Sequence, residues 1–230
     1  MEDTTIKDEL KTYQDLWGAG DYQKSLDWLN QHPESFSAET WHYNLGINLA
    51  KVQRLPEARL HLETAYQLGK RDQKTAESLQ WIHDKLEAKT WESLDSWGDY
   101  VYKFLIYRPQ FFFAQLSLGI IAVGLGFYLL KKISLKWLAA LLAVAFFSFG
   151  IGFVLTQNIL IMTLEPTAIY RGPSTIFDSQ EIPPGVLLYI RKHGPQYKVL
   201  YPSSAAGWII QKPQSEIKQG SLWDLLTKQK

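Results

Sequence analysis

The chain offers few side chains in arrangements that could carry out catalysis. Its 230 residues include no cysteine, which excludes a thiolate metal site, a cysteine nucleophile and a disulfide together. Five histidines are present without the spacing of metal ligands; they are His32, His42, His61, His83 and His193. No glycine-rich phosphate-binding loop occurs. We therefore expect a protein that is not an enzyme and that holds neither a metal nor a cofactor.

Binding is the remaining chemistry, and the charge balance narrows the class of partner. Lysine and arginine number 24 and aspartate and glutamate 23, so no strong positive field favours nucleic acid. Aromatic residues make up 14% of the chain. We therefore expect binding surfaces that include aromatic and apolar side chains.

Residues 1–89 have the pattern of packed amphipathic helices, with apolar residues three and four positions apart. A small residue after a leucine, followed by alternating small and large residues on a second helix, is typical of a tetratricopeptide (TPR) repeat. The residues in these positions are Leu45, Gly46, Ala58, Leu62 and Ala65. A weaker copy has its turn at Gly20, 33 positions before Gln53. The segment 1–89 therefore resembles a TPR-like helical repeat domain, although an ordinary helical bundle would use the same apolar positions.

The TPR resemblance implies a concave surface formed by the first helix of each pair. The residues expected to line this groove and bind a protein are Trp17, Tyr43, Asn44, Ile47 and Trp81. Each of these side chains has packing within the helical core as an alternative role.

The middle of the chain holds two long runs without a charged residue, Gln110–Leu130 and Trp137–Leu164. About twenty apolar residues in a helix span roughly 30 Å, the thickness of a bilayer core. The pattern predicts transmembrane helices at 110–130 and 137–156, joined by a link at 131–136. Residues 90–109 are expected to be an amphipathic connector at the membrane interface, or an extension of the helical packing.

The link between the two runs carries Lys131, Lys132 and Lys136, which predicts a cytoplasmic link by the positive-inside rule. Both flanking parts would then face away from the cytoplasm. Lys103 and Arg108 before the first run, and an N-terminus without a visible signal peptide, point the other way. The sequence leaves open the membrane orientation and whether a signal peptide was removed.

Residues 159–212 alternate β-branched and aromatic residues with turn residues. Four landmarks in order resemble a bacterial SH3-like (SH3b) domain: Tyr170-Arg171-Gly172-Pro173-Ser174, Pro183-Pro184-Gly185, Gln196-Tyr197-Lys198-Val199 and Gly207-Trp208. The structural residues are Gly172, Pro173, Gly185, Gly207 and Trp208, with Trp208 as the expected core anchor. The resemblance implies a surface for a peptide or a cell-wall glycan at Tyr170, Arg171 and Tyr197. Residues 213–230 are expected to be a tail with a short helix.

The order of these parts resembles the BatE-like proteins of the bacterial aerotolerance operon over nearly the whole chain. We expect a multidomain membrane protein with N-terminal all-α TPR-like repeats, a two-helix transmembrane hairpin and a C-terminal all-β SH3-like barrel. The resemblance implies the bacterial inner membrane, with both soluble domains periplasmic. It also implies partners, namely other membrane proteins such as Bat-type proteins with von Willebrand A domains, a MoxR-type ATPase and the lipid bilayer.

The expected function is that of an inner-membrane scaffold or adaptor, which assembles a membrane protein complex through its TPR and SH3-like modules. The alternative is a peptidoglycan-binding anchor or envelope sensor that acts through the SH3-like domain. Sequence leaves open which partners bind and in what stoichiometry, and whether the SH3-like domain binds a ligand at all.

Overall fold

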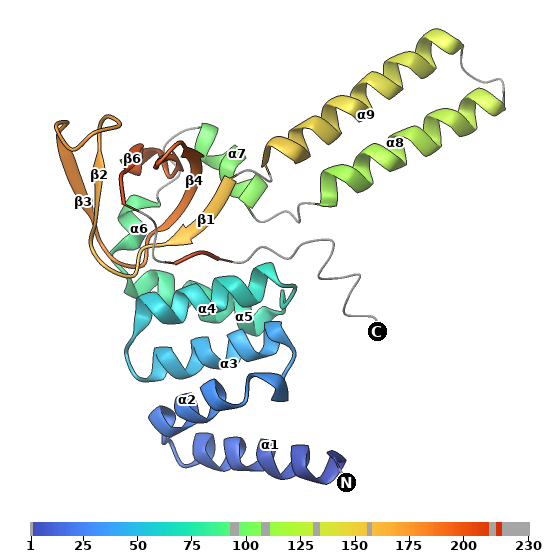
Figure 1. Cartoon of the computed structure of the whole chain (residues 1–230). Helices are drawn as coiled ribbons and strands as arrows, with labels where there is room; N and C mark the ends of the chain where they lie inside the picture. Colours follow the sequence, from blue (N-terminus) through green and yellow to red (C-terminus); the bar gives the residue numbers. More distant parts are fainter. Residues whose placement is uncertain are drawn as a thin grey trace.

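The chain divides into a helical N-terminal part and a C-terminal sheet (Figure 1). The computed structural model describes residues 2–92, 97–106, 111–130, 134–155, 158–211 and 215–217. The helical character predicted for the N-terminal part and the strands predicted for the C-terminal part are both confirmed.

Five helices stack one upon the next at the N-terminal end (Figure 1). They are α1 (Glu2–Gly18), α2 (Tyr22–Gln31), α3 (Ala38–Lys51), α4 (Leu55–Gln67) and α5 (Gln73–Lys85), with a short 3-10 turn η1 (Pro33–Ser35) before α3. Their facing sides bury a common apolar core that includes Leu29, Leu49, Leu62 and Ile82. This stack is called the helical unit below.

Three turns in the helical unit end their helices in the same way. Gly20, Gln53 and Gly69 all have positive φ, at 75°, 65° and 119°. The amide after each turn donates to a carbonyl five residues earlier: Asp21 to Leu16, Arg54 to Leu49 and Lys70 to Ala65. This is the six-to-one bond of a Schellman cap. The turns at Gly20 and Gln53, expected to be equivalent from their spacing, therefore share one backbone geometry.

A connector leads from the helical unit to the sheet through two further helices, α6 (Ala88–Trp91) and α7 (Trp97–Ile106). Ala88 is fully buried and Trp91 packs against the same core of the sheet. Trp97, by contrast, is 81% exposed. The two tryptophans of the connector thus lie in different environments.

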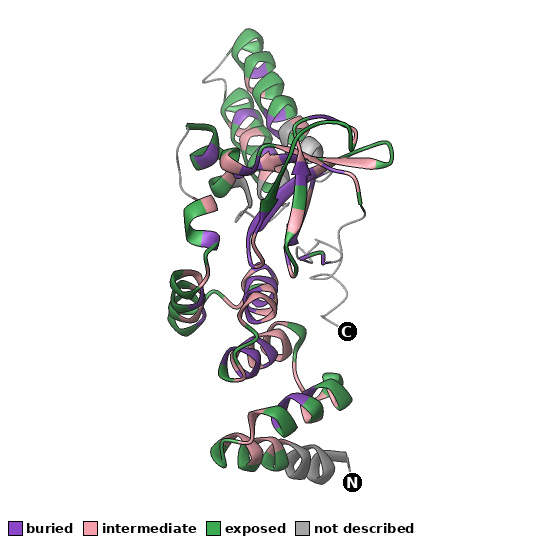
Figure 2. Cartoon of the chain, turned by 90° about the vertical axis from the view of Figure 1, so that its left-hand side faces the viewer, coloured by how far each residue is buried: buried purple, intermediate pink, exposed green. Residues whose placement is uncertain are grey.

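The middle of the chain forms two antiparallel helices, α8 (Phe111–Leu129) and α9 (Leu135–Leu155), which point away from the rest of the molecule (Figure 1). Gly124 of α8 faces Leu141 of α9. Most of their described side chains are exposed (Figure 2), including Leu118, Phe146 and Phe147. Within the described parts of the chain, however, no helix combines the length and the hydropathy required to cross a membrane.

This finding overturns the predicted transmembrane hairpin, and with it the inner-membrane location and the periplasmic placement that rested on two spans. The physical reason is that an absence of charge is not the same as continuous apolar helix. Helix α8 contains Gln115, Ser117 and glycines such as Gly119. The second predicted span, 137–156, is helical as α9 as far as Leu155, and α9 contains Ser148 and the glycines Gly150 and Gly152.

The C-terminal part is one antiparallel sheet with the strand order β1-β4-β5-β6-β2-β3. The strands are β1 (Asn158–Met162), β2 (Thr167–Tyr170), β3 (Ser179–Ile182), β4 (Leu187–His193), β5 (Gln196–Tyr201) and β6 (Gly207–Ile209), with a 3-10 turn η2 (Ser203–Ala205) before β6. Strands β1 and β3 are the two edges. The expected SH3-like barrel is therefore wrong: the sheet is open, because closure requires its first and last strands to pair.

Both faces of the central strand β4 are covered, and all four residues Leu187–Ile190 are buried. On one face, Leu188 and Ile190 join a core with Ala88 of the connector. On the other face, Leu187 and Tyr189 contact a second core, which receives Leu60 of α4, Tyr102 of α7 and Ile217. The connector thus reaches both faces of the sheet, and α4 touches one of them.

Candidate protein-interaction site

The five residues expected to define a TPR repeat lie on α3 and α4. Leu45, Gly46, Ala58, Leu62 and Ala65 are all buried. A Cβ atom on Gly46 would lie 2.6 Å from Leu62 Cγ and 3.1 Å from the Ala58 carbonyl. Because a real Cβ does not approach so closely, the absence of a side chain at Gly46 sets the distance between the two helices.

The five predicted groove residues lie on α1, α3 and α5 and differ in exposure. Trp17 is half-buried and packs edge-on against Tyr22, with ring centroids 5.0 Å apart. On α3, Tyr43 and Ile47 are half-buried against the helical core, and Asn44 is half-buried with its carbonyl accepting a bond from Asn48. Trp81 of α5 is 47% exposed. Trp81 is therefore the predicted groove residue with the most surface to offer a partner.

A basic side chain covers part of this region. The Lys70 ammonium lies 5.0 Å from the centre of the Tyr43 ring, a favourable cation–aromatic contact. Helices α3 and α5 are in contact with each other. The structure therefore places the Tyr43 ring against the Lys70 ammonium, and the exposed indole of Trp81 on the neighbouring helix α5.

The residues expected to form a surface on the SH3-like part are not brought together. Tyr170 of β2 pairs with Trp208 of β6, and Trp208 pairs with Lys198 of β5, which puts these three on one face of the sheet. Tyr197 is the neighbour of Lys198 along β5, so it points to the opposite face and packs against the core. Arg171 is exposed beyond the end of β2.

Four of the five structural residues named for the SH3-like part lie at close contacts. Gly172 is covered by the Phe177 ring, and the Pro173 carbonyl accepts a 2.6 Å bond from the Gln196 amide. The fit is tightest at Gly207, where a Cβ would lie 2.4 Å from Ile169. Gly185, the fourth, has φ +87° and lies against Leu86 of the helical side.

Trp208 does not anchor the core, contrary to the role expected for it. It is half-buried, while its neighbour Ile209 is 4% exposed and belongs to the core. Alternation along β6 sends the two side chains to opposite faces, and the smaller one points inward. The Trp208 indole instead lies beside His193 and Lys198.

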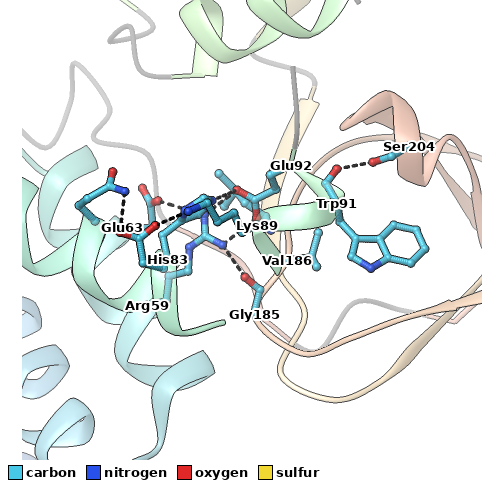
Figure 3. A network of polar contacts seen from close by, with 12 residues as sticks. Arg59, Glu63, His83, Lys89, Trp91, Glu92, Gly185, Val186 and Ser204 are labelled. Atoms are coloured by element: carbon cyan, nitrogen blue, oxygen red, sulfur yellow. Dashed lines mark hydrogen bonds and ion pairs between the residues drawn. The ribbon is translucent and has the colours of Figure 1, made fainter. Parts of the chain in front are cut away.

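A buried ion pair joins the helical unit to the sheet, and it was not among the predicted sites. Arg59 of α4 donates two bonds of 2.7 Å to the Glu92 carboxylate, with side chains 3% and 6% exposed. Arg59 also donates to the Gly185 carbonyl at 2.6 Å, and Glu92 accepts the Leu187 amide at 2.7 Å. Figure 3 shows Glu92 reaching Arg59 from the connector. The turn at Gly185, the start of β4, the connector and α4 therefore share one polar cluster, called the junction below.

Further titratable groups surround this junction. Glu63 lies 3.9 Å from Arg59, and His83 of α5 lies 3.7 Å from Glu92. Burial lowers the pKa of His83, the Arg59 charge lowers it further, and Glu92 opposes the shift. Burial, followed by the nearby Glu92 and Asp99, raises the pKa of Tyr201. A cavity of about 250 Å³ opens beside these residues.

The sequence carried one signal that could have indicated the junction. Arg59 and Glu63 are one helical turn apart and stand beside Ala58 and Leu62, which the repeat pattern marks as buried. A charged pair on an apolar helix face requires a partner within the fold. The identity of that partner, Glu92, is not readable from the pattern because it lies 33 positions away.

The connector is fastened to the sheet at a second point. The Asp99 carboxylate is 1% exposed and accepts both the amide of Ser203, at 2.9 Å, and its hydroxyl, at 2.6 Å. The neighbouring Ser204 hydroxyl donates to the carbonyl of Trp91. The connector expected at a membrane interface is therefore held on the sheet at Trp91, Glu92 and Asp99.

A histidine pair connects α3 and α4. The Nδ1 atoms of His42 and His61 are 2.9 Å apart, and Trp41 packs edge-on against both rings. Burial lowers the pKa of His61 to about 4, with the Arg54 charge as a second cause. No group of three or more histidine, aspartate or glutamate side chains suited to a metal ion occurs in the part of the chain that the structure describes.

The remaining predicted residues concern topology and the tail. Lys136 is exposed in the first turn of α9, while Lys131 and Lys132 lie outside the described residues. The short helix expected in the tail lies outside them as well. Comparison with known protein families, curated proteins and solved structures gives no match to the chain.

Proposed function

We propose that the chain is a non-enzymatic adaptor that assembles a protein complex. The helical unit binds one protein partner through the groove that contains Tyr43 and Trp81, and the sheet binds a second partner or orients the first. The observation that supports this proposal is the junction. There, the buried contacts of Glu92 with Arg59 and with the Leu187 amide hold the helical unit and the sheet together. Two potential binding surfaces are thereby held in one orientation.

The resemblance to BatE-like proteins supplies the first partners to test. Bat-type proteins with von Willebrand A domains, acting with a MoxR-type ATPase, are the candidates it suggests. The resemblance supplies no catalytic residue. The buried Arg59 guanidinium donates to the Glu92 carboxylate and the Gly185 carbonyl, so its role is structural.

Affinity capture of a purified von Willebrand A domain of the Bat type tests the proposal. The intact chain is compared with Trp81→Ala in the groove and with Trp97→Ala, a matched loss of an exposed indole on the connector. We expect Trp81→Ala to lose capture and Trp97→Ala to retain it. Equal capture by all three chains, or no capture by any, would contradict this partner and this groove.

Tyr43→Ala provides a second variant, and its folding requires a control. Tyr43 packs against the helical core, so truncation removes apolar contact as well as groove surface. Thermal unfolding of the variant separates the two effects. Lost capture with an unchanged Tm supports a direct role of the ring in binding.

The alternative function, a peptidoglycan-binding module, has less support. Its predicted surface requires Tyr170 and Tyr197 side by side, whereas the strand register sends them to opposite faces of the sheet. Sedimentation of the intact chain with purified cell-wall sacculi tests this alternative.

A further inference from the structure

One face of the sheet is covered over only part of its area. Over β1 and the start of β4, Tyr102 of α7, Leu60 of α4 and Ile217 bury the strands. Farther along the same face, His193 and Lys198 are exposed and Trp208 is half-buried. This second area, formed by Tyr170, Arg191, His193, Lys198 and Trp208, is called the open face below.

Strand register shows that the side chains of the open face are neighbours. Arg191 pairs with Lys198, Lys198 with Trp208, and Trp208 with Tyr170, so the row crosses four adjacent strands. The Lys198 ammonium lies 5.9 Å from the centre of the Trp208 indole ring, and the centres of the His193 and Trp208 rings are 5.7 Å apart. Directly paired side chains on one face of a sheet lie within contact distance.

The charges of the open face are unevenly distributed. Lys198, Arg191 and His193 supply basic groups over β4 and β5. Arg191 is held in place by a 2.8 Å bond from its Nε to Asn158. Within the described parts of the chain, no carboxylate forms an ion pair with Lys198. Glu181 on edge strand β3 is the acidic residue that register brings to this face, at its far end.

We infer that the open face is a docking surface for an acidic peptide segment of a partner protein. Carboxylates of the peptide lie over Lys198 and Arg191, where they form charge-assisted hydrogen bonds. An apolar or aromatic residue of the peptide packs on Trp208 and Tyr170, since such rings supply much contact area for little loss of conformational freedom. Glu181 repels a carboxylate at the other end and so sets the direction of the segment.

This inference rests on the proposed adaptor function and specifies the chemistry of the partner that the sheet takes. It gives a role to Trp208, which the strand register points outward while the smaller Ile209 fills the core. It also differs from the groove of the helical unit, which is tested by variants on α3 and α5. Failure at one surface therefore leaves the other unaffected.

Fluorescence anisotropy with two labelled decapeptides tests the open face of the full-length chain. One peptide alternates glutamate with leucine, and the other alternates lysine with leucine. We expect binding of the glutamate peptide, weakened by salt, and none of the lysine peptide. Lys198→Glu is expected to weaken binding about tenfold, the effect of losing one charge-assisted contact.

Lys192→Glu is the matched control because it reverses an exposed lysine on the same sheet. Lys192 pairs with Tyr197, so it belongs to the opposite face. Unchanged binding in this variant supports a defined site, whereas an equal loss in both variants shows diffuse attraction and overturns the inference. Absence of binding to the intact chain overturns it as well.

A conservative variant, Trp208→Leu, separates a peptide site from a glycan site. We expect it to weaken binding of the glutamate peptide while circular dichroism stays unchanged. Binding of a neutral chitin oligosaccharide that Trp208→Leu abolishes and Lys198→Glu leaves intact, without peptide binding, would assign the open face to glycans and reject the acidic peptide.

Discussion

Two arginines of α4, Arg54 at its N-cap and Arg59 within it, pair with glutamates in regions of the molecule that differ in burial. Arg54 pairs with Glu57 within the first turn, where the side chains are 52% and 35% exposed. Arg59 pairs with Glu92 at the junction, where they are 3% and 6% exposed. The first pair joins neighbours on one helix, and the second joins α4 to the connector and the sheet.

The two pairs show that the contribution of an arginine–glutamate ion pair to stability depends on its burial. An exposed pair is screened by water and contributes about 0–1 kcal/mol. A buried pair has lost its hydration, so the removal of one partner strands a charge and costs about 3–5 kcal/mol. Substitution of the exposed pair should therefore change stability little, whereas substitution at the junction should destabilise the attachment of the helical unit to the sheet.

The largest expected effect is at the junction. Arg59→Ala leaves the Glu92 carboxylate buried without its guanidinium and removes a donor from the Gly185 carbonyl. We expect the free energy of unfolding to fall by about 3–5 kcal/mol. Arg54→Ala, its counterpart on the surface of α4, is expected to cost about 0–1 kcal/mol. Denaturant unfolding measures both, and equal losses would contradict the distinction between the two regions.

The next effect concerns pH and the histidine pair of the helical unit. The pKa of His61 is about 4 in the folded chain, compared with 6.5 for a histidine that is not buried. As pH falls from 6.5 towards 4, the unfolded chain therefore takes up a proton that the folded chain does not. We expect a loss of up to about 3 kcal/mol of stability over this window. Thermal unfolding against pH measures it.

His61→Gln provides the control for this pH dependence. Glutamine cannot titrate, so the variant is expected to lose the part of the slope between pH 6.5 and 4 that His61 supplies. Acidic groups with lowered pKa, such as Asp72, are the same in both chains and cancel in the difference. An identical pH profile in the two chains would show that His61 is not the group responsible.

A smaller effect is expected from overpacking within the helical unit. Gly46→Ala places a methyl group 2.6 Å from Leu62 Cγ, so α3 and α4 must move apart at a cost of about 1–3 kcal/mol. Gly18→Ala at the end of α1 meets no atom within 4 Å and should be neutral or stabilising by up to about 1 kcal/mol. Chemical denaturation of both variants tests the contrast.

The smallest effect is expected at the cap of α5. The Asp72 carboxylate accepts the Thr75 amide at 2.8 Å and its hydroxyl at 2.8 Å. Asp72→Ala removes this N-cap, and we expect a loss of about 1 kcal/mol. Asp72→Asn keeps an acceptor and should lose less. A greater loss in Asp72→Asn than in Asp72→Ala would contradict the capping role.

Local patterns in the sequence were sufficient for the pairing of α3 with α4. Gly46 and Leu62 were expected at the contact, and they meet there because helical periodicity alone puts them on facing sides. The equivalent turns at Gly20 and Gln53 follow from local caps for the same reason. Such features depend on neighbours within a few residues, which a sequence displays directly.

Three predictions failed where a local sequence pattern was taken to decide how the whole chain packs. Charge-free runs predicted membrane spans, and helices α8 and α9 form there, but no helix among the described residues has the length and hydropathy to cross a membrane. The turn motifs predicted strands correctly and a barrel incorrectly, because the pattern of one strand does not decide which strands form the edges. Trp208 was assigned to the core by size, although its register points it outward.

The sequence by itself determined the N-terminal helices, the C-terminal strands and the lack of cysteine chemistry, because these depend on composition and on short spacings. The tertiary structure decided the junction and the open face. Arg59 meets Glu92 and Leu187 only when α4, the connector and β4 come together. Trp208, Lys198 and Tyr170 become one surface only through strand register. Long-range pairing of this kind depends on how the chain packs, and no short pattern of residues records it.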